Sequence, residues 1–383
     1  MMQKRVKVLV LYGGQSVEHE VSCCSASFLF KHIDQTRFEL HAVGITRDGA
    51  WIPQQTNALL DSPPNKIPIA TSKSAFEPSS LNPVVSPGDF IRSLVRNGAD
   101  QSSSEEALVV FPLVHGSFGE DGTLQGFLEL SQLPYVGSGT LGSAAAMDKH
   151  IAKTLVQAAG IPVVPWTTVR RQQWQETQSA AIEEAEAAFG YPMFVKPACL
   201  GSSVGISKAH NRAELISACD LAFRYDFKIL IETSIENARE LESATLGGFN
   251  PECAGPGEVI PHQGFYSYDA KYISKDGASL QVPAQIPEEL AQKVREMSVN
   301  ISNCLELYGM ARIDLFYSES EQKLYFNEAN TIPGFTDISQ YPMIWKNAGI
   351  SGTRLLTRLI ESAQERFSIA SQFERDYTEG QKA

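Results

Sequence analysis

The chain has 383 residues, of which 43% are hydrophobic and 20% are charged, a composition typical of globular proteins. Its length suggests two or three domains of ordinary size. The formal net charge of −12 argues against unaided binding to nucleic acid or to an anionic membrane, because both need a basic face. No apolar run approaches the roughly 20 residues of a membrane-spanning helix. The six cysteines include no C-x-x-C pair, so we expect free thiols in a reducing cytoplasm.

The first third of the sequence predicts a unit built on a parallel sheet. The run VKVLVL is apolar except for Lys7, as expected for a buried parallel strand, and a Gly-Gly turn leads from it into a helical pattern. The expected elements are a strand at 6–11, a helix at 17–30, strands at 37–45 and 107–114, and a closing segment at 135–138, with a long Pro- and Ser-rich connection over 53–104. We therefore expect an N-terminal α/β substrate domain over residues 1–140.

The remaining residues predict two further units, a central domain over 141–232 and a C-terminal domain over 233–383. The central domain is expected to contain helices at 147–159, 179–189 and 212–223 and strands at 163–169, 192–196 and 228–232. The C-terminal domain is expected to contain a strand at 240–246, a Gly- and Pro-rich loop up to residue 261, a helix at 287–307 and a β-hairpin at 311–330.

The predicted hairpin carries polar side chains with a period of two. Arg312 and Asp314 share one face of its first strand, and Glu328 and Asn330 share one face of its second. A turn centred on Glu321 pairs Asp314 with Glu328 and Arg312 with Asn330. Because like charges opposite one another destabilise a sheet, we expect a positive group between the two carboxylates. Such oxygen ligands suit Mg²⁺ bound to phosphates, although a solvated face with Arg312 paired to the acids fits the same pattern.

Three loops carry further candidate residues. Lys196 ends a strand and is followed by ACLGSSVG, which either covers phosphates with N–H and hydroxyl donors or forms a plain turn. His115 begins HGSFGEDG at a strand edge where α/β proteins bind ligands, with a structural histidine as the alternative. The run TIPGFT after the hairpin can present backbone N–H groups to an oxyanion, although Pro-Gly is also an ordinary turn signal.

Taken in order, these segments resemble the D-alanine-D-alanine ligase family of the ATP-grasp superfamily, from residue 11 to about residue 359. The motifs that carry the resemblance are EHEVS at 18–22, HG at 115–116, GEDG at 119–122, MDK at 147–149, KP at 196–197, GSSVG at 201–205, YDAKY at 268–272, RID at 312–314 and NEANTIPG at 327–334. The resemblance implies an α/β fold, α+β in parts, with a three-domain ATP-grasp architecture and a Rossmann-like N-terminal parallel sheet.

The resemblance also implies a reaction. ATP phosphorylates the carboxylate of one D-alanine, and the amine of a second D-alanine attacks the acyl phosphate to give D-alanyl-D-alanine, ADP and phosphate for peptidoglycan precursor synthesis. The implied enzyme is a cytoplasmic homodimer that uses ATP as co-substrate and two Mg²⁺ ions, for which Mn²⁺ can substitute. Its partners are small molecules, with no nucleic acid and no membrane.

The resemblance assigns roles to residues of this sequence. The implied ATP-binding residues are Lys149 and Lys196 at the phosphates, Glu232 and Ile235 at the adenine, Glu240 at the ribose, Lys271 at the γ-phosphate, and Ser203 and Asn327. The implied metal ligands are Asp314, Glu328 and Asn330. The implied substrate and catalytic residues are Glu20 on the first ammonium with Ser202 and Tyr272 hydrogen-bonded to it, His115 beside that substrate, Arg312 and the Gly334 N–H at the tetrahedral intermediate, and Ser339 and Gln340 at the second carboxylate.

The sequence departs from the family pattern at Gln340, where an apolar residue is more usual, and in the loop after Ile235, which has one extra residue. Tyr272 favours a dipeptide product over a D-alanine-D-lactate ester. The nearest alternative is a related ligase that joins D-alanine to D-lactate or D-serine. A nucleotide-binding sensor without chemistry is a second alternative, and a nicotinamide-dependent dehydrogenase, which would need a glycine fingerprint, is a third.

Overall fold

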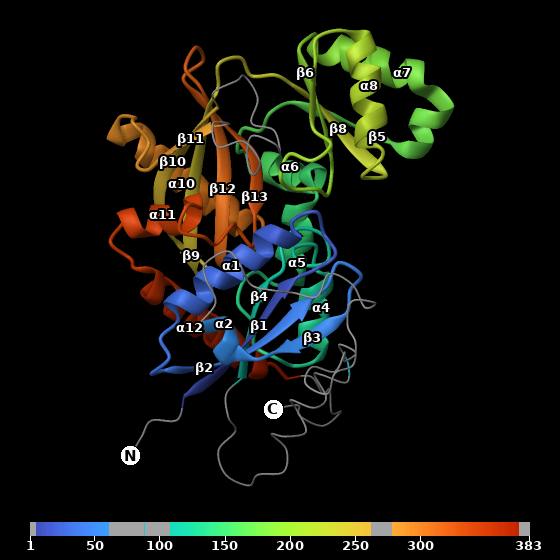
Figure 1. The fold of residues 1–383 in the computed structure, drawn as a ribbon. Coiled ribbons are helices and arrows are strands. Elements are labelled where there is room, and N and C mark those ends of the chain that lie inside the picture. Colours follow the sequence, from blue (N-terminus) through green and yellow to red (C-terminus); the bar gives the residue numbers. More distant parts are fainter. Residues whose placement is uncertain (1–4, 61–87, 89–107, 262–277, 375–383) are drawn as a thin grey trace, which may run out of the picture.

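The computed structural model describes residues 5–60, 88, 108–261 and 278–374. Its N-terminal part is the expected parallel sheet, with β1 (Val6–Gly13) parallel to both β2 (Phe38–Ile45) and β4 (Leu108–Leu113). The edge strand β3 (Trp51–Gln54) runs antiparallel to β2. The sequence predicts that the long connection begins at residue 53, within this strand. Helix α1 (His19–His32) covers one face of the sheet and α4 (Thr123–Leu130) the other (Figure 1). The short helix α2 (Thr56–Leu60) follows β3.

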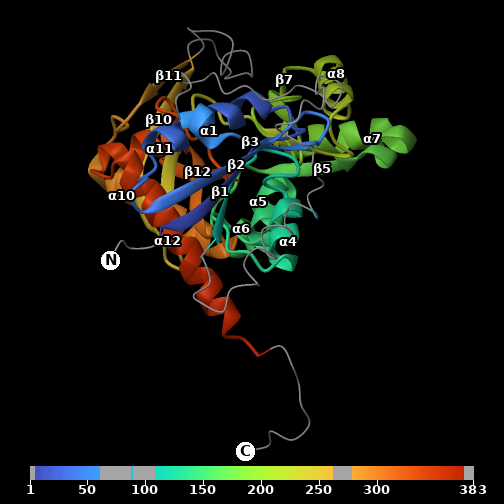
Figure 2. The ribbon, with the colours of Figure 1, turned by 60° about the horizontal axis from the view of Figure 1, so that its bottom comes forward.

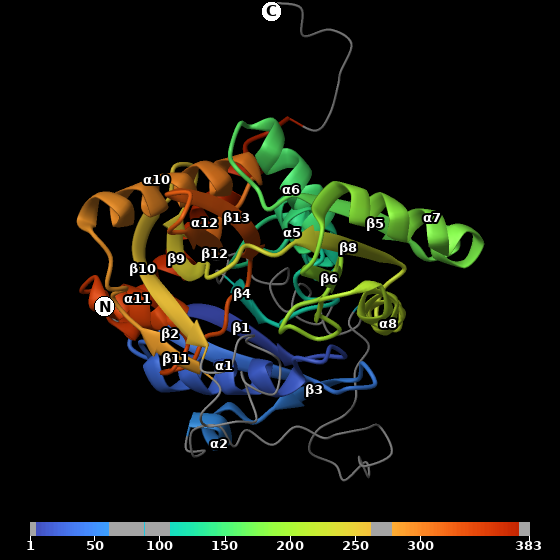
Figure 3. The same cartoon turned by 90° about the horizontal axis from the view of Figure 1, so that it is seen from above.

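The central part is an antiparallel sheet that stands to one side of the molecule. Its strand order is β5 (Trp166–Arg170), β8 (Lys228–Thr233), β6 (Met193–Pro197) and β7 (Ser207–Ala209). Helices α7 (Arg171–Phe189) and α8 (Arg212–Ala222) pack on it and enclose a core of its own. Figure 3 shows this sheet beside the larger C-terminal sheet.

The C-terminal sheet has five antiparallel strands in the order β11 (Ala278–Gln281), β10 (Glu252–Pro261), β9 (Arg239–Gly247), β12 (Gly309–Ser318) and β13 (Lys323–Asn330), and α10 (Glu288–Cys304) packs against it. The prediction of a loop up to residue 261 is wrong, because residues 252–261 form β10. A register shift between Ala254 and Gly257 leaves Pro256 outside the ladder. Proline cannot donate a ladder hydrogen bond, and such a bulge allows the strand to continue past it.

Four helices connect the sheets. Helix α6 (Lys149–Ala158), preceded by α5 (Thr140–Met147), buries Ala152 and Val156 in the core of the C-terminal sheet. Helix α12 (Gly352–Ser371), preceded by α11 (Gln340–Asn347), runs along the N-terminal sheet and contacts α1 and β4 (Figure 2). The domain boundaries near residues 140 and 232 stay predictions, since helices from one segment complete the core of another. Within the described residues, no helix is long and apolar enough to cross a membrane.

Candidate active site

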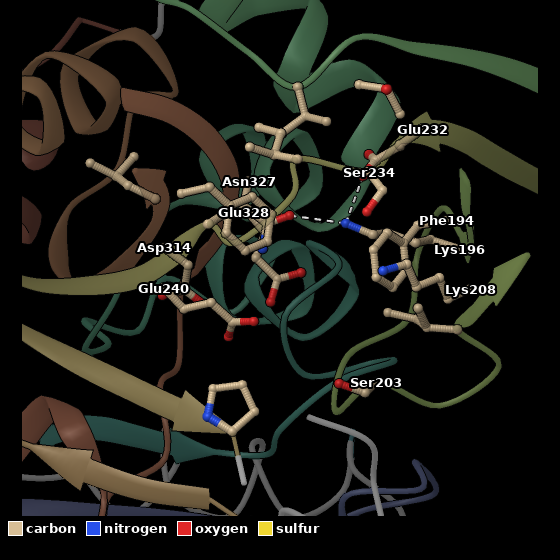
Figure 4. Close-up of a pocket in the computed structure, with 18 of the residues that line it drawn as sticks. Phe194, Lys196, Ser203, Lys208, Glu232, Ser234, Glu240, Asp314, Asn327 and Glu328 are labelled. Carbon is tan, nitrogen blue, oxygen red and sulfur yellow. Dashed lines mark hydrogen bonds and ion pairs between the residues drawn. The ribbon is translucent and has the colours of Figure 1, made fainter. Parts of the chain in front are cut away.

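A cavity of about 560 Å³ lies between the central and C-terminal sheets (Figure 4). The central sheet contributes Phe194, Lys196 and Glu232 to its lining, together with Ser203 from the loop after β6. The C-terminal sheet contributes Glu240, Glu242, Asp314, Asn327 and Glu328. Ile235 lies in the connection between the two sheets and lines the cavity as well. The structure therefore brings together most of the residues expected to bind ATP.

The two predicted pairs are present, but the register next to the turn is one residue off, with Leu315 opposite Phe326, and a bulge after Asp314 restores the predicted pairing. Asp314 pairs with Glu328, and Arg312 pairs with Asn330 across β12 and β13. The Arg312 guanidinium lies 2.6 Å from Asp314 and 3.1 Å from Glu242, and the Asn330 amide donates to Asp314 at 3.0 Å. Burial alone would lower the pKa of Arg312, but Asp314 and Glu242 raise it well above its usual value. Each of the two paired carboxylates has a cation next to it, Arg312 at Asp314 and Lys149 at Glu328.

Three lysines complete the charged cluster. The Lys149 ammonium donates to the Leu200 carbonyl at 2.8 Å and lies 3.2 Å from Glu328. Lys196 lies 2.6 Å from Glu232 and donates to the Asn327 side chain at 3.0 Å. The sequence interpretation missed the third, Lys153, which lies 2.8 Å from Glu232. Its signal was available, because Lys153 follows Lys149 by four residues and therefore lies on the same face of α6.

Opposing effects set the charge of this cluster. Burial alone would raise the pKa of Glu232, but the two lysines beside it bring that pKa below its usual value. Burial lowers the pKa of Lys153 to about 8, despite the favourable charge of Glu232. Burial would also lower the pKa of Lys149, and Glu328 reverses this effect. The acids at the cavity wall are thus neutralised by lysines whose charge they stabilise in return.

A second, smaller cavity lies next to the first, and Glu18 is part of its lining. The Ser202 hydroxyl donates to the Glu18 carboxylate, which links the N-terminal helix to the loop after β6. Glycine lies on both sides of this carboxylate. A Cβ at Gly116 would lie 2.5 Å from a Glu18 oxygen, and one at Gly201 would lie 3.1 Å from it. Glu18 therefore fits closely between two loops that meet at the active site.

The expected hydrogen bond between Glu20 and Ser202 is wrong. The Glu20 side chain is 67% exposed and pairs with Arg47, whereas Ser202 bonds to Glu18. Helix α1 begins at His19, directly after Glu18. Residues two apart on a helix point in nearly opposite directions, since each residue turns the helix by about 100°. Glu18 is the functional candidate that the motif contained and the sequence interpretation passed over.

His115 is buried, with both ring nitrogens bonded within the protein. Nδ1 lies 2.7 Å from the Ile332 carbonyl and Nε2 lies 2.7 Å from the Ser25 hydroxyl, which accepts the Phe335 N–H. The Ser25 hydroxyl therefore donates to Nε2, and Nδ1–H donates to Ile332. Burial lowers the pKa of His115, which favours this neutral form. His115 thus joins the N-terminal sheet to the loop after β13.

Glu120 strengthens the same junction. Its carboxylate accepts the Gly116 N–H at 2.8 Å and the Ile332 N–H at 2.7 Å. Burial and the nearby Glu18 raise the pKa of Glu120 to about 8. This residue belongs to the GEDG motif, yet nothing in its spacing indicated that it would reach a loop more than 200 residues away.

The remaining predicted residues lie at or near the end of this loop. Gly334 is close to Ser339, whose hydroxyl bonds to Thr336 and which precedes α11. Gln340 is 4% exposed, and neither polar atom of its amide has a hydrogen-bond partner in the described part of the chain. Its amide oxygen packs against Gly257 on β10. Lys271 and Tyr272 fall outside the described residues.

The chain matches known proteins over nearly its whole length. Residues 7–138 match the family model described as D-ala D-ala ligase N-terminus, and residues 155–361 match D-ala D-ala ligase C-terminus. The chain is 43% identical to the D-alanine–D-alanine ligase of Shouchella clausii, with 96% of each chain covered. It is 41% identical to D-alanine–D-alanine ligase A of Salmonella typhimurium, with 94% of this chain and 96% of the relative covered.

Solved structures agree with these relatives. The D-alanine-D-alanine ligase of Coxiella burnetii superposes with a TM-score of 0.76 at 31% identity, covering 97% of both chains. The VanG D-Ala:D-Ser ligase of Enterococcus faecalis superposes with a TM-score of 0.78 at 36% identity, covering 94% of this chain and 99% of that one. The expected fold class is confirmed, and the chain belongs to the D-alanine-D-alanine ligase family.

Proposed function

We propose that this protein is an ATP-dependent ligase that joins two D-alanine molecules into D-alanyl-D-alanine. One observation carries the proposal: a cavity large enough for a nucleotide ends at a pair of carboxylates, Asp314 and Glu328, each held by a cation. The chain matches the family models of both the N-terminal and the C-terminal part of D-ala D-ala ligases, and this geometry suits phosphoryl transfer to a carboxylate. The product would serve peptidoglycan precursor synthesis, and we extend the proposal to a cytoplasmic homodimer on the family resemblance alone.

The nucleotide phosphates are proposed to lie between Lys149 and Lys196, with Lys271 added from outside the described residues. In the described state these two lysines are paired with Glu328 and Glu232. When ATP binds with its metal, the two lysines can pair with phosphates, and the Glu328 carboxylate can pair with the metal. Neutralising a transferring phosphoryl group is the main contribution that a protein makes to this step. Ser203, Ile235, Glu240 and Asn327 line the same cavity and are proposed to contact the nucleotide.

The donor set fits Mg²⁺. Asp314, Glu328 and Asn330 offer carboxylate and amide oxygens, the ligands that Mg²⁺ prefers, and we propose that they hold two ions, for which Mn²⁺ can substitute. Among the described residues, no group of three or more His, Cys, Asp or Glu side chains is arranged to hold a metal ion by itself. That is compatible with Mg²⁺, which completes its coordination with phosphate oxygens and water. When bound, the metal supplies charge neutralisation at the β- and γ-phosphates.

The first D-alanine is proposed to bind beside Glu18, which takes the role that the sequence interpretation gave to Glu20. An ionised carboxylate suits the ammonium of an amino acid, and Ser202 fixes its direction. Tyr272 is proposed to join this pair. His115 acts through its bond to the Ile332 carbonyl, which holds the loop carrying Gly334.

Arg312 and the Gly334 N–H are proposed to stabilise the tetrahedral intermediate that forms when the second amine attacks the acyl phosphate. Ser339 and the backbone N–H of Gln340, at the start of α11, are proposed to bind the second carboxylate, because the first N–H groups of a helix have no partner within it.

The test is product formation by the purified protein. We expect ADP release that requires ATP, Mg²⁺ and D-alanine together, with D-alanyl-D-alanine as the product. Equal turnover with L-alanine, or no turnover by folded protein, would overturn the proposal. Parallel reactions with D-serine and D-lactate as second substrate would separate the dipeptide ligase from its nearest alternatives, of which a D-Ala:D-Ser ligase is among the structural neighbours.

A further inference from the structure

Lys153 is a fully buried lysine that the proposed reaction does not use. Its side chain has no exposed area, and its ammonium lies 2.8 Å from the Glu232 carboxylate. It also donates to the Val164 carbonyl at 3.2 Å and lies 5.7 Å from the centre of the Trp166 ring. Burying an ammonium is unfavourable unless its partners are well placed. Packing alone does not explain why a charged side chain is buried at this position.

Glu232 lies between two lysines that differ in access to the cavity. Lys196 lines the cavity, lies 2.6 Å from Glu232 and has Asn327 as a second partner. Lys153 is absent from the cavity lining and approaches Glu232 from behind. When Lys196 turns toward a phosphate, Lys153 is the cation that remains in place beside Glu232. Without any cation, burial would push the pKa of the Glu232 carboxyl upward.

The same helix thus serves both ends of the cavity. Lys149 and Lys153 lie one turn apart on α6, where the first contacts Glu328 and the second contacts Glu232. Glu232 is at the opposite side of Lys196 from the metal-ligand candidates and is part of the cavity wall, where the family resemblance implies that the adenine binds. An ionised carboxylate can only accept hydrogen bonds, whereas a protonated one can also donate.

Resting on the ATP site proposed above, we propose that Lys153 is a positioning residue that keeps Glu232 ionised and thereby makes the site select adenine over a 6-oxopurine. The 6-amino group of adenine donates to an ionised carboxylate. The 6-oxo group of hypoxanthine in ITP is an acceptor, so it finds no donor there and meets a negative charge. Removing the Lys153 charge lets Glu232 take up a proton, and the carboxyl then accommodates either base.

The experiment compares ATP with ITP in the wild type, Lys153→Met, Glu232→Gln and the double variant. Binding of each nucleotide with Mg²⁺ is measured by calorimetry without D-alanine, and KM for each nucleotide is measured in the ligation assay. We expect the wild type to prefer ATP by about 10- to 150-fold, the range given by one hydrogen bond to a charged group. In Lys153→Met this ratio should fall toward one, while KM for D-alanine stays within about twofold because the substrate site is separate.

Two further variants separate charge from packing. Lys153→Arg keeps the charge and should keep most of the ATP preference, and Lys153→Gln keeps a donor for Val164 without the charge and should lose it. The double variant should lose no more preference than Glu232→Gln alone, because Lys153 acts through Glu232. An unchanged ATP to ITP ratio in Lys153→Met or Lys153→Gln, or multiplied losses in the double variant, would overturn this assignment. Absence of ATP-dependent ligation in the wild type would instead overturn the proposed function.

Discussion

Glu18 and Glu20 offer a matched test of the substrate site, because the same substitution can be made two residues apart. Glu18 is 9% exposed and accepts the Ser202 hydroxyl, whereas the Glu20 side chain is 67% exposed and pairs with Arg47. Glu18→Gln removes the charge that faces the proposed ammonium. A hydrogen bond to a charged group contributes about 1.5–3 kcal/mol. At about 1.36 kcal/mol per tenfold change, kcat/KM for D-alanine should fall by roughly 10- to 150-fold.

Glu20→Gln is the control. An exposed ion pair contributes only about 0.2–1 kcal/mol to stability and lies outside the site, so kcat/KM should stay within about twofold of the wild type. The assay is ADP release with D-alanine varied at saturating ATP, and the thermal midpoint of each variant confirms folding. A larger loss of kcat/KM in Glu20→Gln than in Glu18→Gln would refute the substrate site as described, and would restore the residue chosen from the motif.

Three predictions concern stability. Gln340→Leu removes a buried amide without partners among the described residues and should raise the free energy of unfolding by about 1–3 kcal/mol; denaturant titration measures this, and a decrease would show that the amide is satisfied. In the folded protein the pKa of Glu120 is raised to about 8, above its value in the unfolded chain. The neutral carboxyl therefore contributes its full stabilisation below the unfolded pKa, and this contribution is lost as pH rises through the folded pKa. The free energy of unfolding of the wild type, relative to Glu120→Gln, should therefore fall between pH 5 and 8 by at most about 1.4 kcal/mol per unit; a flat difference would contradict the buried neutral carboxyl. Gly119→Ala places a Cβ 1.8 Å from the Val114 carbonyl oxygen and should destabilise the fold strongly, whereas Gly126→Ala on α4, with no neighbour closer than 3.9 Å, should stabilise it by about 0.5–1 kcal/mol; equal midpoints in denaturant would contradict both.

Short-range patterns in this sequence predicted the structure well. The period of two in residues 312–316 and 325–330 indicated which side chains share a face, and Asp314 does pair with Glu328, although a bulge after Asp314, which the sequence did not indicate, is needed to bring the two opposite each other. The apolar run at 6–11 likewise predicted a strand paired on both sides. The face pattern of the hairpin depends only on neighbours within about 20 residues, and the apolar pattern of β1 is local even though its partner strands are distant in the sequence.

The errors arise where distant segments decide the outcome. Glu18 and Glu20 are equivalent in a motif, and only the phase of α1 relative to the loop at Ser202 separates them. Residues 252–261 contain Gly255 and Pro256, which indicate a turn locally, but pairing with β9 and a bulge make the segment a strand. The partner of Lys153 is Glu232 on β8. Nothing in the local sequence around either residue predicts this contact.

The packing of α12 has a consequence for the order in which the protein can fold during synthesis. The N-terminal sheet leaves the ribosome first, yet one of its faces shares a core with Leu355, Leu356 and Leu359 of α12. The apolar side chains of β1 and α1 that meet this helix stay uncovered until almost the entire chain has been translated. The N-terminal sheet is therefore synthesised before α12 but reaches its final packing only after α12 has been synthesised. A nascent chain stopped before residue 350 would expose an apolar face, which favours chaperone binding or aggregation.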